Sequence, residues 1–397
     1  MIIQSMLDND LYKFTMMQAV LHQHPGAMVE YIFKCRTDGI DFRAYVNQII
    51  GEINKMCREL HFEKEELEYL GDLRFIKKDT IQFLKLFKFD YNYLHITADQ
   101  KGRLHIRING PWLHTILFEV PILSIVSEIY SRDMSTDFDE ANRRTLKKID
   151  LIKQCNKEHG LSLLVSEFGG RRRHSVEAQS NLLKLFIDYC SASDLGYGLV
   201  GTSNVMFAKK FGIKAIGTMA HEWLQAHQAL YRVTDSQFMA LENWAKEYRG
   251  DLGIALSDVI SLKHFLYDFD LYFSKLFDGT RQDSGDPFEY GYALIKHYEK
   301  MGIDPMTKTI VFSDGLTIEK AIEILTRFHN DINCSFGIGT HLTNDFGFKA
   351  LQLVLKMTKC NNQPVAKLSD TPGKSMCTDE SYKNYVRQVF DTRISQK

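Results

Sequence analysis

The sequence predicts an α/β fold, in which an irregular TIM-like α/β barrel is joined to an N-terminal α+β domain. Its 397 residues, 44% of them hydrophobic, suffice for a large barrel and additional elements. From about residue 130 onward, short apolar runs alternate with segments of helical length, and small or polar residues follow the apolar runs. This alternation is typical of a β/α barrel, in which the loops after the strands converge on one mouth. An open doubly wound sheet is the alternative.

The predicted α+β domain covers residues 1–128. Residues 29–34, 93–96 and 104–108 are strand-like runs, and residues 45–60 have helical periodicity. These segments indicate a small antiparallel sheet accompanied by helices.

The predicted barrel, which carries the catalytic residues, covers residues 129–372. Helical segments such as residues 176–192, 238–248 and 318–329 separate many of its candidate strands. Residues 373–397 are predicted to be a C-terminal helical extension that packs on the N-terminal domain. The eight candidate strands are residues 161–168, 197–200, 214–216, 253–256, 276–277, 309–312, 335–338 and 365–368.

The composition argues against several classes of protein. The 49 Lys and Arg residues nearly balance the 50 Asp and Glu residues, so no whole-chain charge favours nucleic acid or an anionic membrane. The most apolar stretch, residues 112–129, is interrupted by His114, Glu119 and Pro121, which argues against a membrane span. The 7 cysteines are scattered without a CxxC pair, which suggests neither a disulfide framework nor a zinc site. Because the first residues include acids where a secretory signal has basic ones, we expect a cytoplasmic protein.

The most charged loop after a candidate strand is EFGGRRRHS, residues 167–175. Each guanidinium of Arg171, Arg172 and Arg173 carries a fixed charge and five donors, so the three cannot all be buried without partners. Two interpretations remain open: an anion clamp for phosphate or carboxylate, and a solvated basic start of a helix.

Other loops after strands carry weaker signals of the same kind. Arg281 and Asp283 in DGTRQDSGDP suit a ribose or Mg²⁺ site beside a phosphate, although such loops also form ordinary turns. SDG (residues 313–315) and GIGT (residues 337–340) resemble backbone cradles for phosphate. GTSN (residues 201–204) adds neutral polar groups.

His221 lies in GTMAHEW, after another candidate strand. It lacks an HxH or HxxxH companion, which disfavours a metal ligand. A packed histidine and a reacting group remain as alternatives. A neutral imidazole is a competent nucleophile, and the adjacent Glu222 is a candidate for orienting it.

Taken together, these motifs resemble the nicotinate phosphoribosyltransferase family, whose pattern runs through essentially the whole chain in one order. The resemblance implies an irregular α/β barrel joined to an N-terminal α+β domain. The matching stretches include LDNDLYKF, EFGGRRR, VGTSN, GTMAHEW, LGIALSD, RQDSGDP, VFSDGL, SFGIGTHLTND and PVAKLSDTPGKS.

The resemblance also implies a reaction. Nicotinate and 5-phosphoribosyl 1-pyrophosphate (PRPP) would give nicotinate mononucleotide and pyrophosphate, the first step of NAD synthesis from nicotinate. ATP and water would be converted to ADP and phosphate through a transient phosphohistidine at His221. Mg²⁺ would accompany the phosphorylated substrates without a dedicated protein metal cage. A homodimer is expected, with Tyr12 contributed across the interface.

The resemblance assigns roles to residues that match the family's motifs. His221, Glu222, Arg281 and Asp283 would be catalytic. The expected substrate-binding residues are Tyr12 and Phe168 on either side of the pyridine ring, with Arg171, Thr202 and Ser203. The expected phosphate-binding residues are Arg172, Ser313, Asp314, Gly315, Gly339 and Thr340.

The expected preference for nicotinate rests on Ser203. Nicotinamide-using relatives carry an aspartate at this position, which would repel a carboxylate, whereas a hydroxyl can donate to it. The alternatives are a nicotinamide or quinolinate phosphoribosyltransferase, a catalytically silent ligand-binding relative, and a lyase that uses Lys367 as a Schiff base. The chain departs from the common family pattern FGTRRRFS at Gly170 and His174, and carries Gln282 where a histidine is common.

Overall fold

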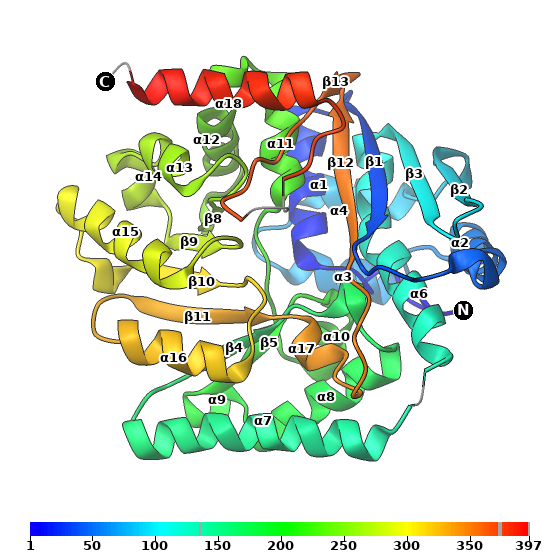
Figure 1. Ribbon diagram of the computed structural model, residues 1–397, viewed down its shortest axis with the longest axis horizontal. Helices are drawn as coiled ribbons and strands as arrows, with labels where there is room; N and C mark the ends of the chain where they lie inside the picture. Colours follow the sequence, from blue (N-terminus) through cyan, green and yellow to red (C-terminus); the bar gives the residue numbers. More distant parts are fainter. Residues whose placement is uncertain (135, 372–374, 396–397) are drawn as a thin grey trace.

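A computed structural model of the protein describes residues 1–134, 136–371 and 375–395. Within these residues the strands form two sheets (Figure 1). The order in the parallel sheet is β6-β5-β4-β11-β10-β9-β8, and the order in the second sheet, whose pairs are antiparallel, is β13-β12-β1-β3-β2.

The parallel sheet is a barrel that is not fully closed. Its last strand, β11, pairs with its first, β4, as closure of a barrel requires, and the gap lies between β6 and β8. The predicted irregular barrel is therefore confirmed, and the doubly wound alternative is wrong. The strands are β4 (Leu164–Glu167), β5 (Gly198–Thr202), β6 (Lys214–Ala215), β8 (Ile254–Leu256), β9 (Gly279–Gln282), β10 (Thr309–Phe312) and β11 (Asn333–Ile338).

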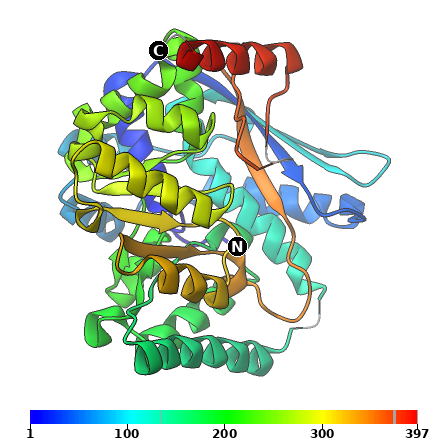
Figure 2. The same ribbon diagram turned by 60° about the vertical axis from the view of Figure 1, so that its left-hand side comes forward.

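Helices follow most of these strands and cover the outside of the sheet (Figures 1 and 2). Several of them begin at a side-chain cap: Asp286 accepts hydrogen bonds from the backbone of Phe288 and Glu289 at the start of α15, which has proline in its first turn. The helices of this region are α7 (Phe138–His159), α8 (Val176–Tyr189), α9 (Ala192–Leu195), α10 (Val205–Phe211), α11 (His221–Leu230), α12 (Ser236–Tyr248), α13 (Leu262–Asp268), α14 (Leu271–Leu276), α15 (Pro287–Lys300), α16 (Ile318–Phe328) and α17 (Thr340–Thr343).

Two of the eight predicted barrel strands are wrong. Residues 276–277 end α14, and the strand begins two residues later at Gly279. A Cβ at Gly279 would lie 1.8 Å from the carbonyl oxygen of Thr309, so the neighbouring strand approaches too closely for a side chain. Residues 365–368 do not join the parallel sheet; Lys367 instead forms an isolated bridge with Met376.

The antiparallel sheet combines strands from the N-terminal and C-terminal parts of the sequence. Its central strand, β1 (Met28–Cys35), pairs on one side with β3 (Leu104–Pro111) and on the other with β12 (Leu353–Cys360). The remaining strands are β2 (Leu94–Ala98) and β13 (Gln363–Pro364). The N-terminal sheet therefore includes β12, which the sequence analysis assigned to the barrel segment; the predicted boundary at residues 372–373 lies outside the described residues.

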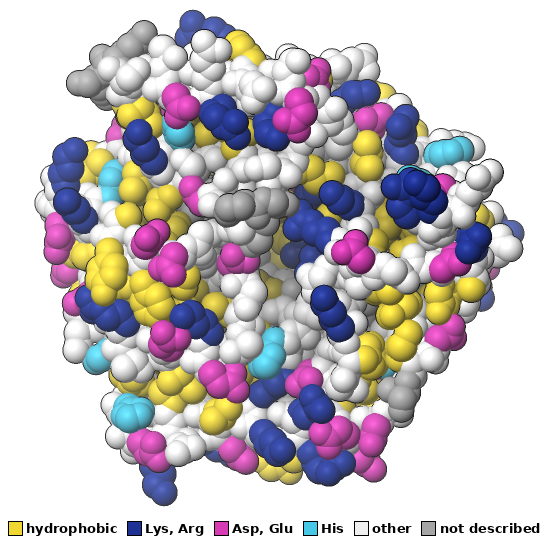
Figure 3. Space-filling model, viewed as in Figure 1, with side chains coloured by type: hydrophobic (Ala, Val, Ile, Leu, Met, Phe, Trp, Pro, Cys, Tyr) yellow, Lys and Arg dark blue, Asp and Glu magenta, His cyan; other side chains and the backbone are white. Residues whose placement is uncertain are grey.

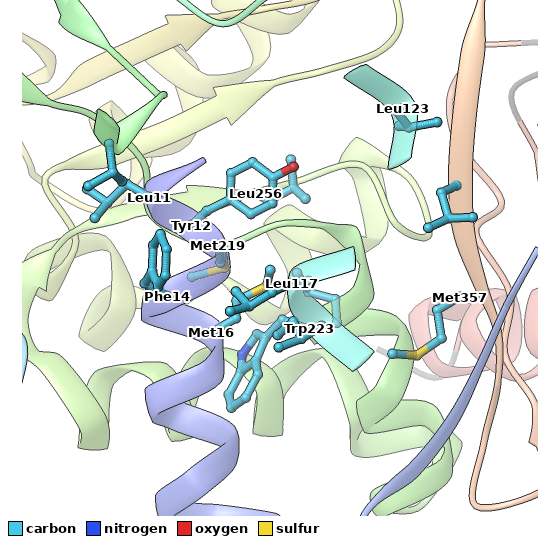
Figure 4. Packing of buried hydrophobic residues seen from close by; sticks show 14 of the residues in the cluster. Leu11, Tyr12, Phe14, Met16, Leu117, Leu123, Met219, Trp223, Leu256 and Met357 are labelled. Atoms are coloured by element: carbon cyan, nitrogen blue, oxygen red, sulfur yellow. The ribbon is translucent and has the colours of Figure 1, made fainter. Parts of the chain in front are cut away.

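Three of the N-terminal helices, α1, α5 and α6, are largely buried, whereas α2, α3 and α4 bury only one face. The segment Trp112–Arg132 is long and apolar enough to cross a membrane, but 94% of its apolar window is buried inside the protein, where it packs as a core element. Met16 of α1, Leu117 and Trp223 of α11 lie together in this core (Figure 4). The elements are α1 (Leu11–Gln23), α2 (Val46–Glu59), α3 (Lys64–Asp72), α4 (Lys78–Leu86), α5 (Trp112–Thr115) and α6 (Glu119–Arg132), with short 3₁₀ turns η1 (Phe42–Ala44), η2 (Tyr91–Tyr93) and η3 (Ile116–Phe118).

The C-terminal helix α18 (Glu380–Ser395) packs mainly against α13 and the turn η5 (Val233–Asp235). Arg393 forms an ion pair with Asp268 at 2.6 Å, and His264 and Asp391 approach to 3.1 Å. The extension was expected to pack on the N-terminal domain. Its apolar face instead contacts the outer barrel helices (Figure 1).

Candidate active site

A cavity of about 450 Å³ opens where the strand ends of the barrel face β12. Figure 3 shows a hollow near the middle of this face, with Lys and Arg side chains along it. The lining contains nearly every residue for which the sequence predicted a role. These are Tyr12, Phe168, Arg171, Arg172, Ser203, His221, Glu222, Arg281, Asp283, Ser313, Asp314, Gly315, Gly339 and Thr340.

His221 is the first residue of α11 and is 6% exposed. Its Nε2 lies 2.9 Å from Asp258 Oδ1 and 3.5 Å from Asp283 Oδ2. Lys367 Nζ is 2.7 Å from the same nitrogen. Burial and the charge of Lys367 lower the pKa of His221 to about 4, so the imidazole is neutral at pH 7.

The predicted orienting role of Glu222 is not supported by the contacts. Glu222 Oε2 accepts from Lys13 Nζ at 2.7 Å, and the same ammonium lies 2.6 Å from Glu119 Oε2. This buried triad joins α1, α6 and α11. Because successive helical residues point about 100° apart, Glu222 is directed away from the ring that precedes it. The carboxylate that contacts His221 is Asp258.

Sequence reasoning missed the roles of Asp258 and Lys367. Asp258 lies two residues after the last residue of β8, so its position at a strand end was the signal that could have found it. Lys367 was considered only as a Schiff-base amine. Its Nζ lies 2.6 Å from Asp258 Oδ2 and 2.7 Å from His221 Nε2, and both of these neighbours are buried. The amine is therefore held by Asp258 and His221, which does not favour its use as a Schiff-base amine.

Aromatic side chains also line the cavity. A Cβ at Gly337 would lie 2.3 Å from Phe168 Cε2, which means that the Phe168 ring packs directly on the backbone of β11. The Arg171 guanidinium lies 5.8 Å from the centre of the Tyr12 ring. Tyr12 reaches this cavity from the same chain, whereas the sequence analysis expected it from a partner.

The two hydroxyls of the GTSN loop have different environments. Ser203 Oγ donates to Asp10 Oδ1 at 2.6 Å and lines the cavity. Thr202 is fully buried, and its hydroxyl donates to Glu167 Oε2 at 2.6 Å; among the described residues, Thr202 is not part of the cavity lining. Its hydroxyl is therefore engaged with Glu167, and its contact with substrate stays a prediction. Burial raises the pKa of Asp10, and this effect outweighs the opposing charge of Arg171 and the hydrogen bond from Ser203.

The three consecutive arginines are also distinct. Arg173 is fully buried and donates to both carboxylate oxygens of Asp8 at 2.7 Å, so its role is structural. Arg172 donates to the carbonyl of Leu353 at 2.8 Å, and burial with the charge of Arg171 lowers its pKa to about 10. Arg171 lies in the cavity at 3.5 Å or more from its acidic neighbours.

The strand ends of β9 and β10 form the most polar wall of the cavity. Ser313 Oγ donates to Asp283 Oδ1 at 3.1 Å. Arg281 has one long contact, 3.5 Å from Nη1 to the Met219 carbonyl, and within the described part of the chain its buried Nε has no hydrogen-bond partner. Gly315 has a φ of +59°, a conformation that favours glycine and turns the backbone of the SDG loop.

The charges of the cavity suit an anionic ligand. Burial lowers the pKa of Lys356 on β12 to about 8 although Glu119 opposes the shift, so an arriving anion would stabilise the ammonium form. The cationic lining residues are Arg36, Arg171, Arg172, Arg281, Lys356 and Lys367.

Two sequence profiles match this chain. The profile of the nicotinate phosphoribosyltransferase (NAPRTase) family matches residues 163–394, and that of the NAPRTase N-terminal domain matches residues 7–127. The chain belongs to the nicotinate phosphoribosyltransferase family.

Relatives in the nicotinate phosphoribosyltransferase family match along the whole chain. The nicotinate phosphoribosyltransferase of Xanthomonas euvesicatoria is 54% identical over 394 residues, which are 98% of each chain. That of Verminephrobacter eiseniae is 52% identical over 405 residues, covering 98% of this chain and 99% of the relative. The crystal structure of nicotinate phosphoribosyltransferase from Vibrio cholerae has a TM-score of 0.94 at 36% identity, and covers 98% of this chain and 94% of that one. The structure from Porphyromonas gingivalis has a TM-score of 0.91 at 34% identity, with coverages of 98% and 100%.

One cluster in this family member has the composition of a cation site. His221, Asp258 and Asp283 each bring a potential ligand atom within 4.8 Å of the others. The ammonium of Lys367 lies 2.6 Å from Asp258 and supplies a positive charge at the same place. Asp283, which lines the open cavity, is the carboxylate better placed to meet a cation that arrives with a phosphorylated ligand.

Proposed function

We propose that this chain joins nicotinate to PRPP, releasing nicotinate mononucleotide and pyrophosphate, and that ATP drives the reaction through a transient phosphohistidine at His221. One observation carries the proposal: a neutral, buried imidazole held by a carboxylate lies in the same cavity as the cationic groups and the loops at the ends of β9, β10 and β11. The family membership of the chain supports it.

Two sets of lining residues suit the two substrates. Phe168 and Tyr12 present aromatic rings to the cavity, and a pyridine ring would bind against them. Arg281 and the SDG loop line the same cavity and would bind the 5-phosphate and pyrophosphate. The ring nitrogen would attack C1 of the ribose while pyrophosphate leaves, so catalysis would depend on positioning and on stabilising charge rather than on a strong base.

The residues present fit Mg²⁺ bound together with the phosphorylated substrates. Carboxylates are its preferred protein ligands, and Asp283 and Asp314 line the cavity. When bound, Mg²⁺ would neutralise charge on the pyrophosphate. Arg281, two residues before Asp283, would hold the same group, and Ser313 would orient the Asp283 carboxylate through their 3.1 Å hydrogen bond.

Nicotinamide is a second candidate substrate because of Asp10. The Ser203 hydroxyl that was expected to donate to nicotinate already donates to Asp10, whose carboxylate lines the cavity. An amide could donate to that carboxylate, whereas Arg171 would favour the carboxylate of nicotinate. We favour nicotinate because the arginine charge is only loosely paired.

The test is a labelling and turnover experiment. The protein is incubated with γ-labelled ATP, with and without nicotinate and PRPP. We expect acid-labile, base-stable label that is lost in His221→Asn, and product formation that depends on nicotinate. A panel of nicotinate, nicotinamide and quinolinate identifies the substrate. Turnover without ATP and without label would refute the phosphohistidine, and turnover of nicotinamide alone would refute the substrate assignment.

A further inference from the structure

Lys13 of α1 is a buried cation that two acids share. Its Nζ lies 2.6 Å from Glu119 Oε2 and 2.7 Å from Glu222 Oε2, and its side chain is fully buried. Contacts this short are charge-assisted hydrogen bonds. Both carboxylates line the cavity, whereas Lys13, in the described part of the chain, does not. The ammonium thus holds two acids of the cavity wall without facing the cavity itself.

The Glu119 carboxylate lies between Lys13 and Arg171. Its Oε1 is 3.5 Å from Arg171 Nη1, a longer and weaker contact than the 2.6 Å one between Oε2 and Lys13. Burial opposes the ionisation of Glu119, but the charges of Lys13 and Arg171 lower its pKa to about 2. The carboxylate is therefore charged at pH 7, and its stronger partner is Lys13.

The second acid beside Arg171 is also held by another group. Asp10 Oδ2 lies 3.6 Å from Arg171 Nε, and Asp10 Oδ1 accepts a hydrogen bond from Ser203 at 2.6 Å. The Arg171 side chain is 36% exposed and lines the cavity. A guanidinium whose ion contacts are this long can still present two parallel N–H donors to a carboxylate that enters from solution.

We propose that Lys13 is a specificity-determining residue for nicotinate: by holding Glu119, it keeps the Arg171 guanidinium available to the carboxylate of the substrate. The inference rests on the proposed function, because nicotinate must bind beside Arg171. It goes further by giving a role in substrate choice to a buried residue that does not line the cavity. Lys13 acts through Glu119 and Arg171, so it is a positioning residue.

The loss of Lys13 would turn Glu119 against an acidic substrate. A buried carboxylate that loses its cation is costly, and Arg171 already lies 3.5 Å away, so Glu119 would pair with Arg171 instead. The guanidinium would then be occupied, and the negative charge of Glu119 and Glu222 would repel the nicotinate carboxylate. Nicotinamide carries no such charge and would be affected less.

Substitutions at the two ends of the Lys13–Glu119 contact test the proposal. In Lys13→Met we expect the KM for nicotinate to rise about tenfold or more, as for the loss of one charge-assisted contact. Glu119→Gln removes the acid that competes for Arg171, while Lys13 keeps Glu222, so the KM for nicotinate should fall by about twofold or more. A merely structural role would make both variants bind nicotinate worse.

The direction of the two changes decides the outcome. An unchanged KM in Lys13→Met, or a KM that rises in both variants, would overturn the inference. Where Lys13→Met does not fold, Glu119→Gln decides, and a KM that does not fall in this variant would overturn the inference. If the unmodified chain does not use nicotinate at all, the proposed function fails and the inference with it.

Nicotinamide and a second lysine provide the controls. The inhibition constant of nicotinamide against nicotinate should change less than about threefold in Lys13→Met, because this ligand has no carboxylate. A rise equal to that of the KM for nicotinate would overturn the charge argument. Lys308→Met is the matched variant, because Lys308 is also buried, donates to the Phe277 carbonyl at 2.7 Å and lies outside the cavity lining. It should leave both constants unchanged.

Discussion

Arg171, Arg172 and Arg173 follow one another in the chain, but their charges are paired to different degrees. Arg173 makes a two-pronged contact with Asp8 and is fully buried. Arg171 is 36% exposed and lies 3.6 Å from Asp10 and 3.5 Å from Glu119. The sequence left an anion clamp and a solvated helix start equally open, because it does not show which arginine meets an acid elsewhere in the fold. The contacts assign a structural task to one and a ligand-facing position to another.

This difference predicts opposite effects of two neighbouring substitutions. Arg173→Met leaves the Asp8 carboxylate buried and without its cation, so we expect a loss of about 3–5 kcal/mol in the free energy of unfolding. Arg171→Met should cost at most about 1–2 kcal/mol, because its ion pairs are long and partly solvated. It should raise the KM for nicotinate at least tenfold. Urea unfolding and steady-state kinetics measure both quantities, and equal destabilisation by the two variants would contradict the assignment.

At the scale of elements, the carboxyl ends of the strands determine what the cavity contains. The sequence predicted this well: Phe168 follows β4, Ser203 follows β5, Asp283 follows β9 and Ser313 follows β10, and all four line the cavity. Alternating apolar and polar runs are a local property, so they can be read from the chain. Contacts between the groups at different strand ends depend on the tertiary structure, so they cannot be read from the local sequence. Asp258 was therefore missed as the partner of His221.

The end of β11 provides a surface for Phe168 because Gly337 has no side chain. A Cβ there would overlap the ring, whereas a Cβ at Gly170 would make only ordinary contacts at 3.7 Å. Gly337→Ala should therefore displace the ring and raise the KM for nicotinate about tenfold or more, with a smaller effect on the KM for PRPP. Gly170→Ala, in the same loop as the ring, is the control and should leave both constants within about twofold. Equal KM values for nicotinate in Gly337→Ala and Gly170→Ala would contradict the packing of the Phe168 ring on Gly337.

At the scale of the whole molecule, pairing between distant segments determines which sheet a strand joins, and the sequence alone does not show this. Residues 353–360 have an apolar pattern that suits a strand in either sheet, and only their pairing with β1 places them in the antiparallel one. Residues 365–368 were predicted as a barrel strand because their apolar pattern also suits a strand without showing where it pairs. The sequence of α18 likewise predicts an apolar face, but it does not show which surface that face contacts. In the structure the face contacts the outer barrel surface. The local sequence pattern predicts helices and strands, whereas long-range pairing determines which sheet each strand joins.

Buried histidines give the whole molecule a dependence on pH. Burial lowers the pKa of His174 to about 4 and that of His227 to about 3, below the ordinary value of 6.5. Between pH 6.5 and about 4 the unfolded chain therefore binds protons at these positions that the folded chain does not. Stability attributable to these groups is present above pH 6.5 and is lost as the pH falls. Raised carboxyl pKa values, such as that of Glu167, act in the opposite direction.

A single substitution isolates this effect. The His174 ring stacks on Phe346 at a centroid distance of 3.8 Å, and the common family pattern has phenylalanine at this position. His174→Phe removes the titration, so its stability advantage over the unmodified chain should grow by up to about 2 kcal/mol between pH 7 and pH 5. Thermal unfolding of both proteins across this range measures the difference. A difference that stays constant with pH would show that His174 titrates alike in both states.

The pairing of β12 with β1 has a consequence for how the protein is made. Thr358 donates a hydrogen bond to Glu30 across 328 residues of chain, so β1 emerges from the ribosome long before the strand that pairs with it. Until then β1 has β3 on one side and an open edge on the other, and His221 lacks Lys367. A chain released before residue 353 would thus contain every strand of the parallel sheet, yet it would be prone to aggregate and lack the group that holds Nε2. The active site is therefore complete only after β12 and Lys367 have been synthesised.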